Sequence, residues 1–244
     1  MKPKISVIIP AHNEERYVKR CLASVRRAAR QYGGPVETIV VCNRCTDRTE
    51  QVALACGAVT VRDDTRCIAS VRNAGIRAAT GRIVVTIDCD NRMTPGTLRE
   101  IWSLLKTGRY IGGGAPMRFE RLSVPLWLNE ALCAAGFSVT GLYCGIFWAR
   151  RSTFDAIGGF ADLRAMEDVE TAKRLRAYGR QRGLAYTHLR ENYLINSTRK
   201  FDREGDWLYF RMLLANGGTF VRAMLGNTGG LDALIDRLFY DYEH

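Results

Sequence analysis

The sequence predicts an α/β protein with a mostly parallel central sheet flanked by helices, and two observations carry this prediction. Short runs of β-branched, apolar residues alternate with segments in which apolar residues recur at helical spacing. Each run ends in a polar turn before the next helical pattern begins. Strands that alternate with helices in this way pair in parallel through right-handed crossovers. The 244 residues, 47% of them hydrophobic, exclude disordered and collagen-like chains and can bury one large core.

The first part of the chain repeats a unit of strand, turn and helix. The first apolar run ends at Pro10, and the helix after it stops at Gly33-Gly34-Pro35, because proline cannot continue a helix. The second helix ends at Gly57. In order, we expect a strand at 5–10, a helix at 17–32, a strand at 36–41, a helix at 51–56, a strand at 59–61, a helix at 69–79 and a strand at 83–87.

The alternation weakens in the second part of the chain. Thr94 and Pro95 suit an N-cap and a first helical residue, which predicts a helix to about Leu105. Beyond it we expect a strand at 110–116, an amphipathic helix at 122–137, a strand at 142–149, a helix at 168–178 closed by Gly179, and helical patterns at 207–214 and 231–239. We therefore expect one α/β unit over residues 1–200 and a helical C-terminal extension over 201–244 that packs on it.

The net charge of +11 arises from 36 Lys and Arg against 25 Asp and Glu. These cations are spread over several expected elements and mixed with acids, and no nucleic-acid reader motif is present, which disfavours a nucleic-acid binder. The tail after Thr198 holds six basic and seven acidic residues, so the positive excess lies in the α/β unit. We expect part of this excess to face an anionic ligand.

The cysteines predict a reducing compartment, and neither apolar run of the chain predicts a signal peptide or a membrane span. Eight cysteines suit buried thiols, and Cys42-Asn43-Arg44-Cys45 has neither a second such pair nor a histidine pair for zinc. The apolar start at 5–10 is too short for a signal peptide. Residues 131–149 carry no charge, but glycines and polar residues interrupt them, so we do not expect a membrane span. The expected location is the cytoplasm, with the inner face of the membrane as the alternative.

Polar turns follow three of the expected strands, at the edge where a parallel sheet binds its ligands. These turns are Pro10-Ala11-His12-Asn13-Glu14, Asn43-Arg44-Cys45-Thr46-Asp47 and Asp88-Cys89-Asp90. The first turn lacks the glycine pattern of dinucleotide-binding dehydrogenases. Asp88 and Asp90 suit Mg²⁺ or Mn²⁺ bound together with substrate phosphates, and turn or helix-capping acids are the alternative interpretation.

Four further charged residues have both a structural and a functional interpretation. Glu167 and Asp168 precede or begin a helix, where the helix dipole stabilises acids, and a general base is the functional alternative. Arg72 and Arg199 have the chemistry to grip phosphates, although arginines on helices usually face solvent. Taken one at a time, none of these residues decides the function.

Taken in order, five segments resemble the family 2 glycosyltransferases, which have the GT-A fold. The segments read ISVIIPAHNEE, VVCNRCTDRT, RNAGIRAATGRIVVTIDCDN, GLYCGIFWARRSTFDAIGGF and MEDVETAKRLRAYG, and the resemblance covers about residues 4–200. It implies an inverting hexosyltransferase that moves a sugar from a nucleoside-diphosphate sugar to an acceptor hydroxyl, with Mn²⁺ or Mg²⁺ as the cofactor.

The resemblance also implies roles for the matched residues. Asp168 matches the catalytic base, and Glu167 matches its acidic neighbour. Asp88 and Asp90 match the metal and diphosphate motif, with Asp90 the more direct metal ligand. The residues expected to bind the nucleotide sugar are Pro10, Ala11, His12, Glu14, Asn43, Arg72, Asp88, Cys89, Asp90 and Arg199.

The chain also departs from the family pattern. Asn43 stands where relatives have an acid that contacts the base, which leaves the nucleobase open because an amide both donates and accepts. The family's C-terminal metal-site histidine has no counterpart, and neither His188 nor His244 is assigned to it. A non-catalytic nucleotide-sugar binding protein and a nucleotidyltransferase on a related scaffold remain as alternatives, although Gly158-Gly159-Phe160 before Glu167-Asp168 favours glycosyl transfer.

The acceptor is expected on the side built by residues 122–137, 141–151 and Glu167-Asp168. Apolar residues there suit an apolar or lipid-linked acceptor, and packing in the core or in a homodimer is the favoured alternative. These residues are Trp127, Leu128, Leu132, Phe137, Phe147 and Trp148. Peripheral contact of the basic surface with an anionic membrane is a further alternative.

Overall fold

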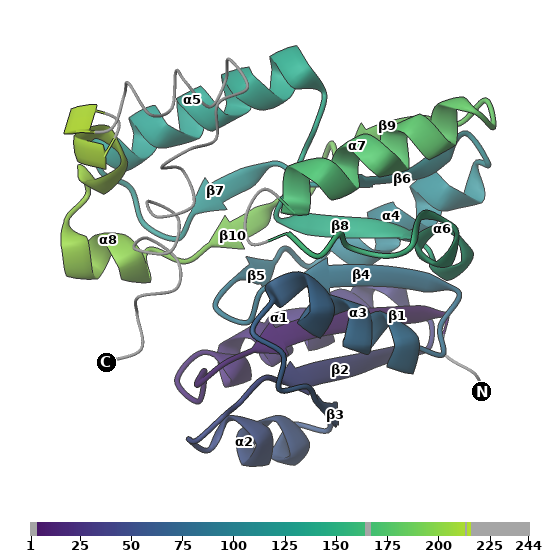
Figure 1. The fold of residues 1–244 in the computed structure, drawn as a ribbon, viewed down its shortest axis with the longest axis horizontal. Coiled ribbons are helices and arrows are strands. Elements are labelled where there is room, and N and C mark those ends of the chain that lie inside the picture. Colours follow the sequence, from purple (N-terminus) through teal and green to yellow (C-terminus); the bar gives the residue numbers. More distant parts are fainter. Residues whose placement is uncertain (1–3, 164–166, 213, 216–244) are drawn as a thin grey trace.

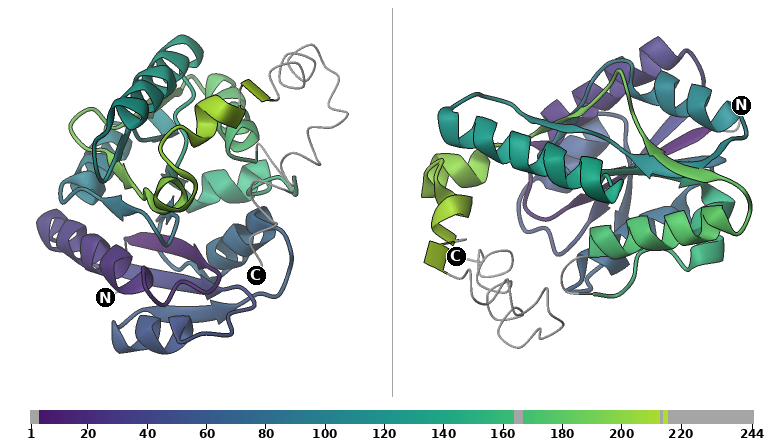
Figure 2. Two further views of the ribbon diagram at one scale, coloured as in Figure 1. Left: turned by 90° about the vertical axis from the view of Figure 1, so that its left-hand side faces the viewer. Right: turned by 90° about the horizontal axis from the view of Figure 1, so that it is seen from above.

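The computed structural model describes residues 4–163, 167–212 and 214–215. It shows a seven-stranded sheet with helices on both faces and a three-stranded sheet beside it (Figures 1 and 2). In chain order the elements are β1 (Ile5–Ala11), α1 (Val18–Tyr32), β2 (Val36–Cys42), α2 (Thr49–Ala55), β3 (Val59–Arg62), α3 (Ile68–Ala78), β4 (Ile83–Ile87), β5 (Arg92–Met93), α4 (Thr97–Lys106), β6 (Tyr110–Gly114), β7 (Met117–Phe119), α5 (Val124–Thr140), β8 (Ile146–Arg150), α6 (Arg151–Ile157), α7 (Glu167–Arg180), β9 (Ala185–His188), β10 (Leu194–Asn196) and α8 (Arg199–Glu204).

The large sheet has the strand order β3-β2-β1-β4-β8-β6-β9. The strands β3, β2, β1 and β4 are parallel neighbours, as the sequence predicts, and Ile5 lies opposite both Val36 and Ile83. The strand β8 runs antiparallel to β4 and to β6, while β9 pairs in parallel with β6. The carboxyl ends of β1, β2 and β4 therefore lie at one edge of the sheet, where their polar turns meet.

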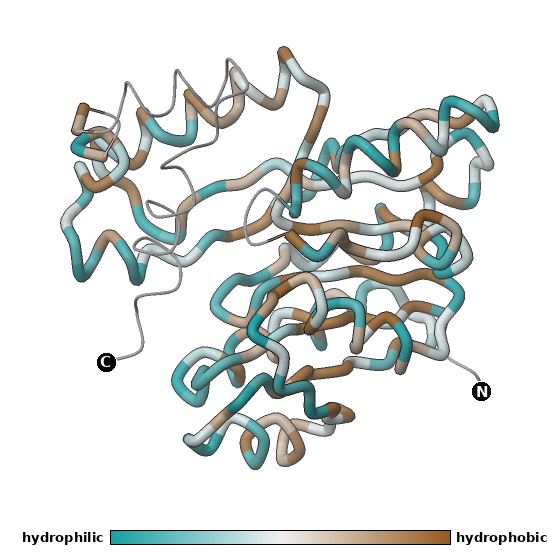
Figure 3. Tube along the Cα trace, viewed as in Figure 1, coloured by the Kyte–Doolittle hydropathy of each residue, from teal (hydrophilic) through white to brown (hydrophobic). Residues whose placement is uncertain are grey.

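Helices bury both faces of the central strands. All seven residues of β1 are buried. Ile5, Val7 and Ile9 pack in the cluster that includes α1 and α4, and Ile8 packs against α3 on the opposite face. The close approach of α3 depends on Gly75, because a Cβ atom there would lie 2.2 Å from Ile8 Cγ2. All eight cysteines are free thiols. Hydrophobic residues are prominent along the central strands (Figure 3).

The small sheet has the order β5-β10-β7, with β10 antiparallel to β5 and parallel to β7. The helix α5 packs against β7 at the same end of the molecule (Figure 1). The sequence does not predict this sheet, because strands of two or three residues are too short to show a period. Residues 197–199, which follow β10, return to the carboxyl end of β4, where Arg199 contacts Asp90.

Two helices differ from the predicted bounds. The helix α4 begins at Thr97 rather than at Pro95, and Thr94 is not its N-cap. The hydroxyl of Thr94 instead donates to Asn192 Oδ1 at 2.8 Å, which ties the helix start to the segment before β10. The helix α7 continues through Gly179, the residue expected to close it, for one further residue.

The helix α5 differs most from its prediction. The sequence predicts an amphipathic helix, but the only buried residues of α5 are Pro125, Leu126 and Asn129. Apolar side chains also cover its outer surface, where Trp127 is 59% exposed and Val139 87%. Among the helices in the described part of the chain, none is both long and apolar enough to cross a membrane.

The expected C-terminal extension is described only in part. The helix α8 begins close to the expected boundary at residue 200, and helical residues continue at 208–212. Phe201 of α8 packs with Phe119 and Leu126, so this helix joins the small sheet to α5. The helical pattern at 231–239 lies outside the described residues, and the division into two units stays a prediction.

Candidate active site

The polar turns after β1 and β2 are bound to each other. Asn13 and Arg44 have left-handed backbone conformations, with φ of 51° and 46°. Asn13 Oδ1 accepts a hydrogen bond from the backbone N–H of Thr46 at 2.8 Å. The backbone N–H of Glu14 donates to Thr49 Oγ1 at 2.7 Å. These contacts hold Asn13 in its left-handed conformation and tie the two turns into one platform.

The predicted nucleoside residues lie together on this platform. Pro10 and Ala11 are the last residues of β1, and His12 Nδ1 lies 2.7 Å from the backbone oxygen of Asn43. The side-chain amide of Asn43 donates to the backbone carbonyls of Asp63 at 2.6 Å and of Thr65 at 2.7 Å. Because both of its N–H groups are used, the Asn43 side chain can only accept a further hydrogen bond.

One arginine joins the acids at the end of β4 to those at the start of α7. Arg72 of α3 is buried, and its Nη2 lies 2.9 Å from Asp88 Oδ1. Its Nη1 lies 3.0 Å from Glu167 Oε1 and 3.0 Å from Asp168 Oδ1. Burial alone would lower the pKa of Arg72, but the three carboxylates outweigh burial and raise it. We call these four residues, Arg72, Asp88, Glu167 and Asp168, the Arg72 cluster.

Asp168 has the electrostatic character of a base. Burial raises its pKa to about 6, against the lowering effect of Arg72 and with a further increase from Glu167 and Asp88. A carboxyl group with this pKa is still ionised at neutral pH and is a stronger base than an ordinary aspartate. Its place in the first turn of α7 favours the ionised form through the helix dipole.

A second arginine pairs with two other acids of the same edge. Arg199 Nε lies 3.0 Å from Asp90 Oδ2, and Arg199 Nη1 lies 2.6 Å from Glu14 Oε1. Burial raises the pKa of Glu14 to about 7 and also raises the pKa of Asp90. The other oxygen of Glu14, Oε2, is buried without a hydrogen-bond partner within the described residues. We call Arg199, Glu14 and Asp90 the Arg199 cluster.

The oxygen atoms at this edge suit a hard divalent cation. Asp88 and Asp90 offer carboxylate oxygens, the donors that Mg²⁺ and Mn²⁺ prefer, and the buried Oε2 of Glu14 still lacks a partner. No set of three His, Cys, Asp or Glu side chains in the described ranges is placed to hold a metal ion. An ion here would therefore take further ligands from substrate phosphates or water.

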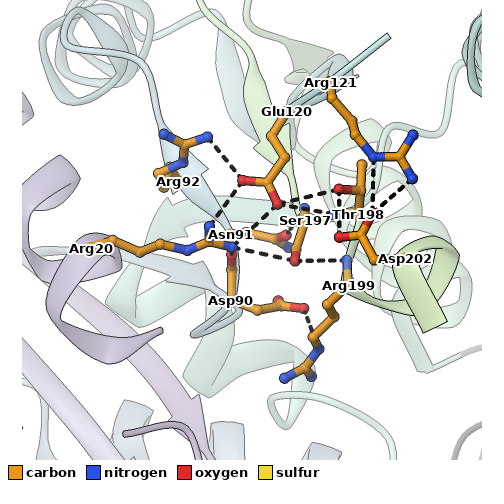
Figure 4. Close-up of polar contacts among 10 residues, drawn as sticks. All are labelled: Arg20, Asp90, Asn91, Arg92, Glu120, Arg121, Ser197, Thr198, Arg199 and Asp202. Carbon is orange, nitrogen blue, oxygen red and sulfur yellow. Dashed lines mark hydrogen bonds and ion pairs between the residues drawn. The ribbon is translucent and has the colours of Figure 1, made fainter. Parts of the chain in front are cut away.

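A third polar network is centred on Glu120 (Figure 4), and the sequence does not predict it. Glu120 Oε2 accepts from Arg20 Nη1 at 3.0 Å and from Arg92 Nη2 at 3.1 Å. Glu120 Oε1 accepts from the backbone N–H of Thr198 at 3.1 Å, which fixes the residue next to Arg199. No motif surrounds Glu120, so only the tertiary contacts identify it.

Two other residues considered in the sequence do not direct their side chains into this arrangement. Cys89 packs in the core cluster below α1, and burial raises the pKa of its thiol. A ligand contact at this position would therefore have to come from its backbone. His188 of β9 stacks on Tyr143, with 3.9 Å between the ring centroids, and burial lowers its pKa.

The residues proposed for an apolar acceptor divide into two groups. Phe147 and Trp148 of β8 are fully buried, so the favoured interpretation, packing in the core, is confirmed for them and they do not face an acceptor. They are buried because β8 lies inside the sheet, between β4 and β6. Trp127 and Leu132 of α5 are exposed, while Leu128 and Phe137 are half-buried.

Known proteins match much of this chain. The family model described as glycosyl transferase family 2 matches residues 6–168. An uncharacterized glycosyltransferase of Mycobacterium tuberculosis strain H37Rv is 34% identical over 104 residues, which cover 43% of this chain and 44% of the relative. The probable glycosyltransferase YdaM of Bacillus subtilis is 26% identical over 198 residues, 71% of this chain and 46% of the relative. The chain spans less than half the length of these relatives.

Solved structures share the fold. TarS of S. aureus in complex with UDP-GlcNAc has a TM-score of 0.63 at 18% identity, and the match covers 80% of this chain and 58% of the TarS chain. The mannosyltransferase PcManGT of Pyrobaculum calidifontis, in complex with GDP-Man and Mn²⁺, has a TM-score of 0.64 at 21% identity, with coverages of 80% and 57%. Glucosyl-3-phosphoglycerate synthase of Mycobacterium tuberculosis with UDP has a TM-score of 0.55 at 25% identity, with coverages of 77% and 70%. The fold is GT-A, and because the family model also matches more than half of the residues, the chain belongs to glycosyl transferase family 2.

Proposed function

We propose that this chain is a metal-dependent, inverting glycosyltransferase in which Asp168 is the general base. The Arg72 cluster carries the proposal, because one buried guanidinium joins Asp88 to Glu167 and Asp168. Asp168, proposed to accept a proton, and Asp88, proposed to bind the diphosphate, therefore contact the same guanidinium. Glycosyl transfer needs a base and a leaving-group site next to the same sugar.

The donor is proposed to be a nucleoside-diphosphate sugar, with its nucleoside over Pro10, Ala11, His12 and Glu14 and its base against Asn43. Asn43 can only accept, since its N–H groups bind backbone carbonyls. Uracil and guanine suit this acceptor because each carries an imino N–H, which the corresponding ring nitrogens of cytosine and adenine lack. The neighbours solved with UDP-GlcNAc, UDP and GDP-Man support this choice, since their nucleotides carry such bases.

The diphosphate is proposed to lie at Asp88 and Asp90, which would hold Mg²⁺ or Mn²⁺ with Asp90 as the more direct ligand. When bound, such an ion stabilises the negative charge of the leaving diphosphate. The neighbour solved with GDP-Man and Mn²⁺ supports this part of the proposal. Arg199 lies beside Asp90 and supplies a further positive group for the same phosphates. Arg72 is likewise proposed to lie near the nucleotide, and its contact with Asp88 supports this.

In the proposed reaction, Asp168 removes the proton of an acceptor hydroxyl whose oxygen attacks the anomeric carbon. The new glycosidic bond forms as the bond from the anomeric carbon to the diphosphate oxygen breaks, and the nucleoside diphosphate leaves with that electron pair. Attack occurs on the face opposite the leaving group, so the anomeric configuration inverts. Arg72 orients Asp168 and, together with the helix dipole, holds it in the ionised form that can accept a proton.

The acceptor is proposed to be apolar or lipid-linked, and the exposed surface of α5 supports this. Leu122, Val124 and Trp127 line a shallow hollow at the start of that helix. A homodimer that covers the same surface is the alternative, and sedimentation tests it. Contact of the basic surface with an anionic membrane is a separate alternative, which salt-sensitive vesicle binding tests. The cytoplasmic location stays a prediction.

Calorimetry and a product assay test the proposed function. UDP or GDP should bind more tightly with Mn²⁺ than without it, whereas CDP and ADP should bind weakly. The matching nucleotide sugar should then be consumed, with inversion read from the anomeric proton by NMR. Binding without turnover would favour the non-catalytic binding protein. Pyrophosphate release from a nucleoside triphosphate and a sugar phosphate would favour the nucleotidyltransferase.

A further inference from the structure

Arg199 contacts the same carboxylate that the proposed function assigns to a divalent ion. Its guanidinium bridges Asp90 and Glu14 through Nε and Nη1, at 3.0 Å and 2.6 Å (Figure 4 shows the Asp90 contact). Glu14 is only 7% exposed, and its Oε2 is buried without a hydrogen-bond partner in the described ranges. The two acids therefore surround one guanidinium and leave one buried oxygen that a second positive group can satisfy.

The side chain of Arg199 is loosely enclosed. It is 38% exposed, whereas the side chain of Arg72 is 6% exposed and contacts three carboxylates. Water can therefore replace a carboxylate as the partner of the Arg199 guanidinium, whereas the largely buried Glu14 and Asp90 need a cation in its place. Arg199 can therefore leave its partners more readily than the enclosed Arg72 can leave its three carboxylates.

The backbone that carries Arg199 is nevertheless held firmly. The N–H of Thr198 donates to Glu120 Oε1 at 3.1 Å, and the N–H of Ser197 donates to Asn91 Oδ1 at 3.0 Å. Asn91 directly follows Asp90 in the sequence, so the two segments are tied together beside the ion pair. A side chain that leaves Asp90 from this anchored position stays within reach of a ligand at the same edge.

We propose that Arg199 is a displaceable counter-ion of Asp90, which occupies the position of the divalent ion in the absence of donor and turns to the donor diphosphate when the ion binds. This inference rests on the proposed function, in which Asp90 is a ligand of the ion. Because the guanidinium and the ion compete for one carboxylate, each weakens the binding of the other. A diphosphate offers the guanidinium a second anion, so nucleotide and ion bind with positive coupling.

Binding of Mn²⁺ without nucleotide tests the proposal, with the free ion measured by electron paramagnetic resonance. Arg199→Gln should bind Mn²⁺ alone at least about fivefold more tightly than the wild type, because the competing cation is gone. In the wild type UDP or GDP should increase Mn²⁺ affinity by a larger factor than in Arg199→Gln. Arg199→Lys, which keeps the charge but loses the planar fork, should lie between the two. Arg180→Gln removes the same charge from the exposed end of α7 and should leave Mn²⁺ affinity unchanged.

The outcomes separate this inference from the proposed function. Equal or weaker Mn²⁺ binding in Arg199→Gln would overturn the counter-ion role. Loss of Mn²⁺ binding in Asp90→Asn would, even then, still support the proposed metal site. If Mn²⁺ bound neither protein, with or without UDP or GDP, the metal-dependent function and this inference would both be wrong. Thermal unfolding of each variant shows whether it is folded, and Arg199→Lys preserves the test if Arg199→Gln is not.

Discussion

The Arg72 cluster and the Arg199 cluster have the same chemistry at one edge of the sheet, yet their arginines differ in burial. Arg72 is enclosed by α3, β4 and α7, with 6% of its side chain exposed, while the Arg199 side chain is 38% exposed at the start of α8. An enclosed guanidinium that leaves its carboxylates finds neither another partner nor water, whereas a partly exposed one can turn to water or to another anion. The Arg72 side chain is therefore fixed in place, whereas the Arg199 side chain can move.

The largest effect is expected inside the Arg72 cluster, at Asp168. Asp168→Asn keeps the size of the side chain but cannot accept a proton, so turnover should fall by about 10²- to 10⁴-fold. Donor affinity should change little, because the proposed donor contacts lie on other residues. Steady-state kinetics and calorimetry measure the two quantities. The matched control, Asp155→Asn on the exposed surface of α6, should keep wild-type turnover. Unchanged turnover in Asp168→Asn would remove Asp168 from its role.

The next largest effect is a difference in stability between the two arginines. Arg72→Met should lower the free energy of unfolding by about 3–5 kcal/mol, because three carboxylates would lose a buried cation. Arg199→Gln should lower it by less, about 1–2 kcal/mol, because the Arg199 side chain is partly exposed although the largely buried Glu14 and Asp90 lose a cation. Urea unfolding followed by circular dichroism measures both values. Equal losses in the two variants would contradict the division into a fixed and a movable arginine.

The smallest effect is the pH dependence that the Arg72 cluster imposes. Burial raises the pKa of Asp168 to about 6, and the base must be ionised to act. On acidification kcat/KM should therefore fall through pH 6, by about tenfold for each pH unit below it. Glu167→Gln should move this limb to lower pH, because the charge of Glu167 raises the pKa of Asp168. A limb that stays in place or moves upward in Glu167→Gln would show that Glu167 does not act on Asp168.

Prediction from the sequence succeeds where structure is local. The strand β4 has the predicted bounds, because a continuous β-branched run between two turns has few alternatives. Prediction fails for the small sheet and for the direction of β8, because both depend on contacts between distant segments. The apolar residues of β8 were ambiguous for the same reason. Their composition does not show that Phe147 and Trp148 lie inside a sheet.

The candidate site divides in the same way. The sequence and its family resemblance select Asp88, Asp90 and Asp168, and the structure brings these acids to one edge. They do not select Glu120, whose partners Arg20 and Arg92 come from other elements. An amide can donate or accept, and only the contacts of Asn43 with the loop at 63–65 show that both of its N–H groups are already used.

The sequence by itself determined the parallel half of the sheet, the polar turns at the strand ends and the kinds of side chain in them. These properties follow from periodicity and turn chemistry over a few neighbouring residues. Only the tertiary structure decided the partners of the charged groups. Arg72 meets Glu167 across 95 positions and Arg199 meets Glu14 across 185, and contacts over such separations leave no local pattern. Burial, which separates the fixed arginine from the movable one, likewise exists only after the chain has folded.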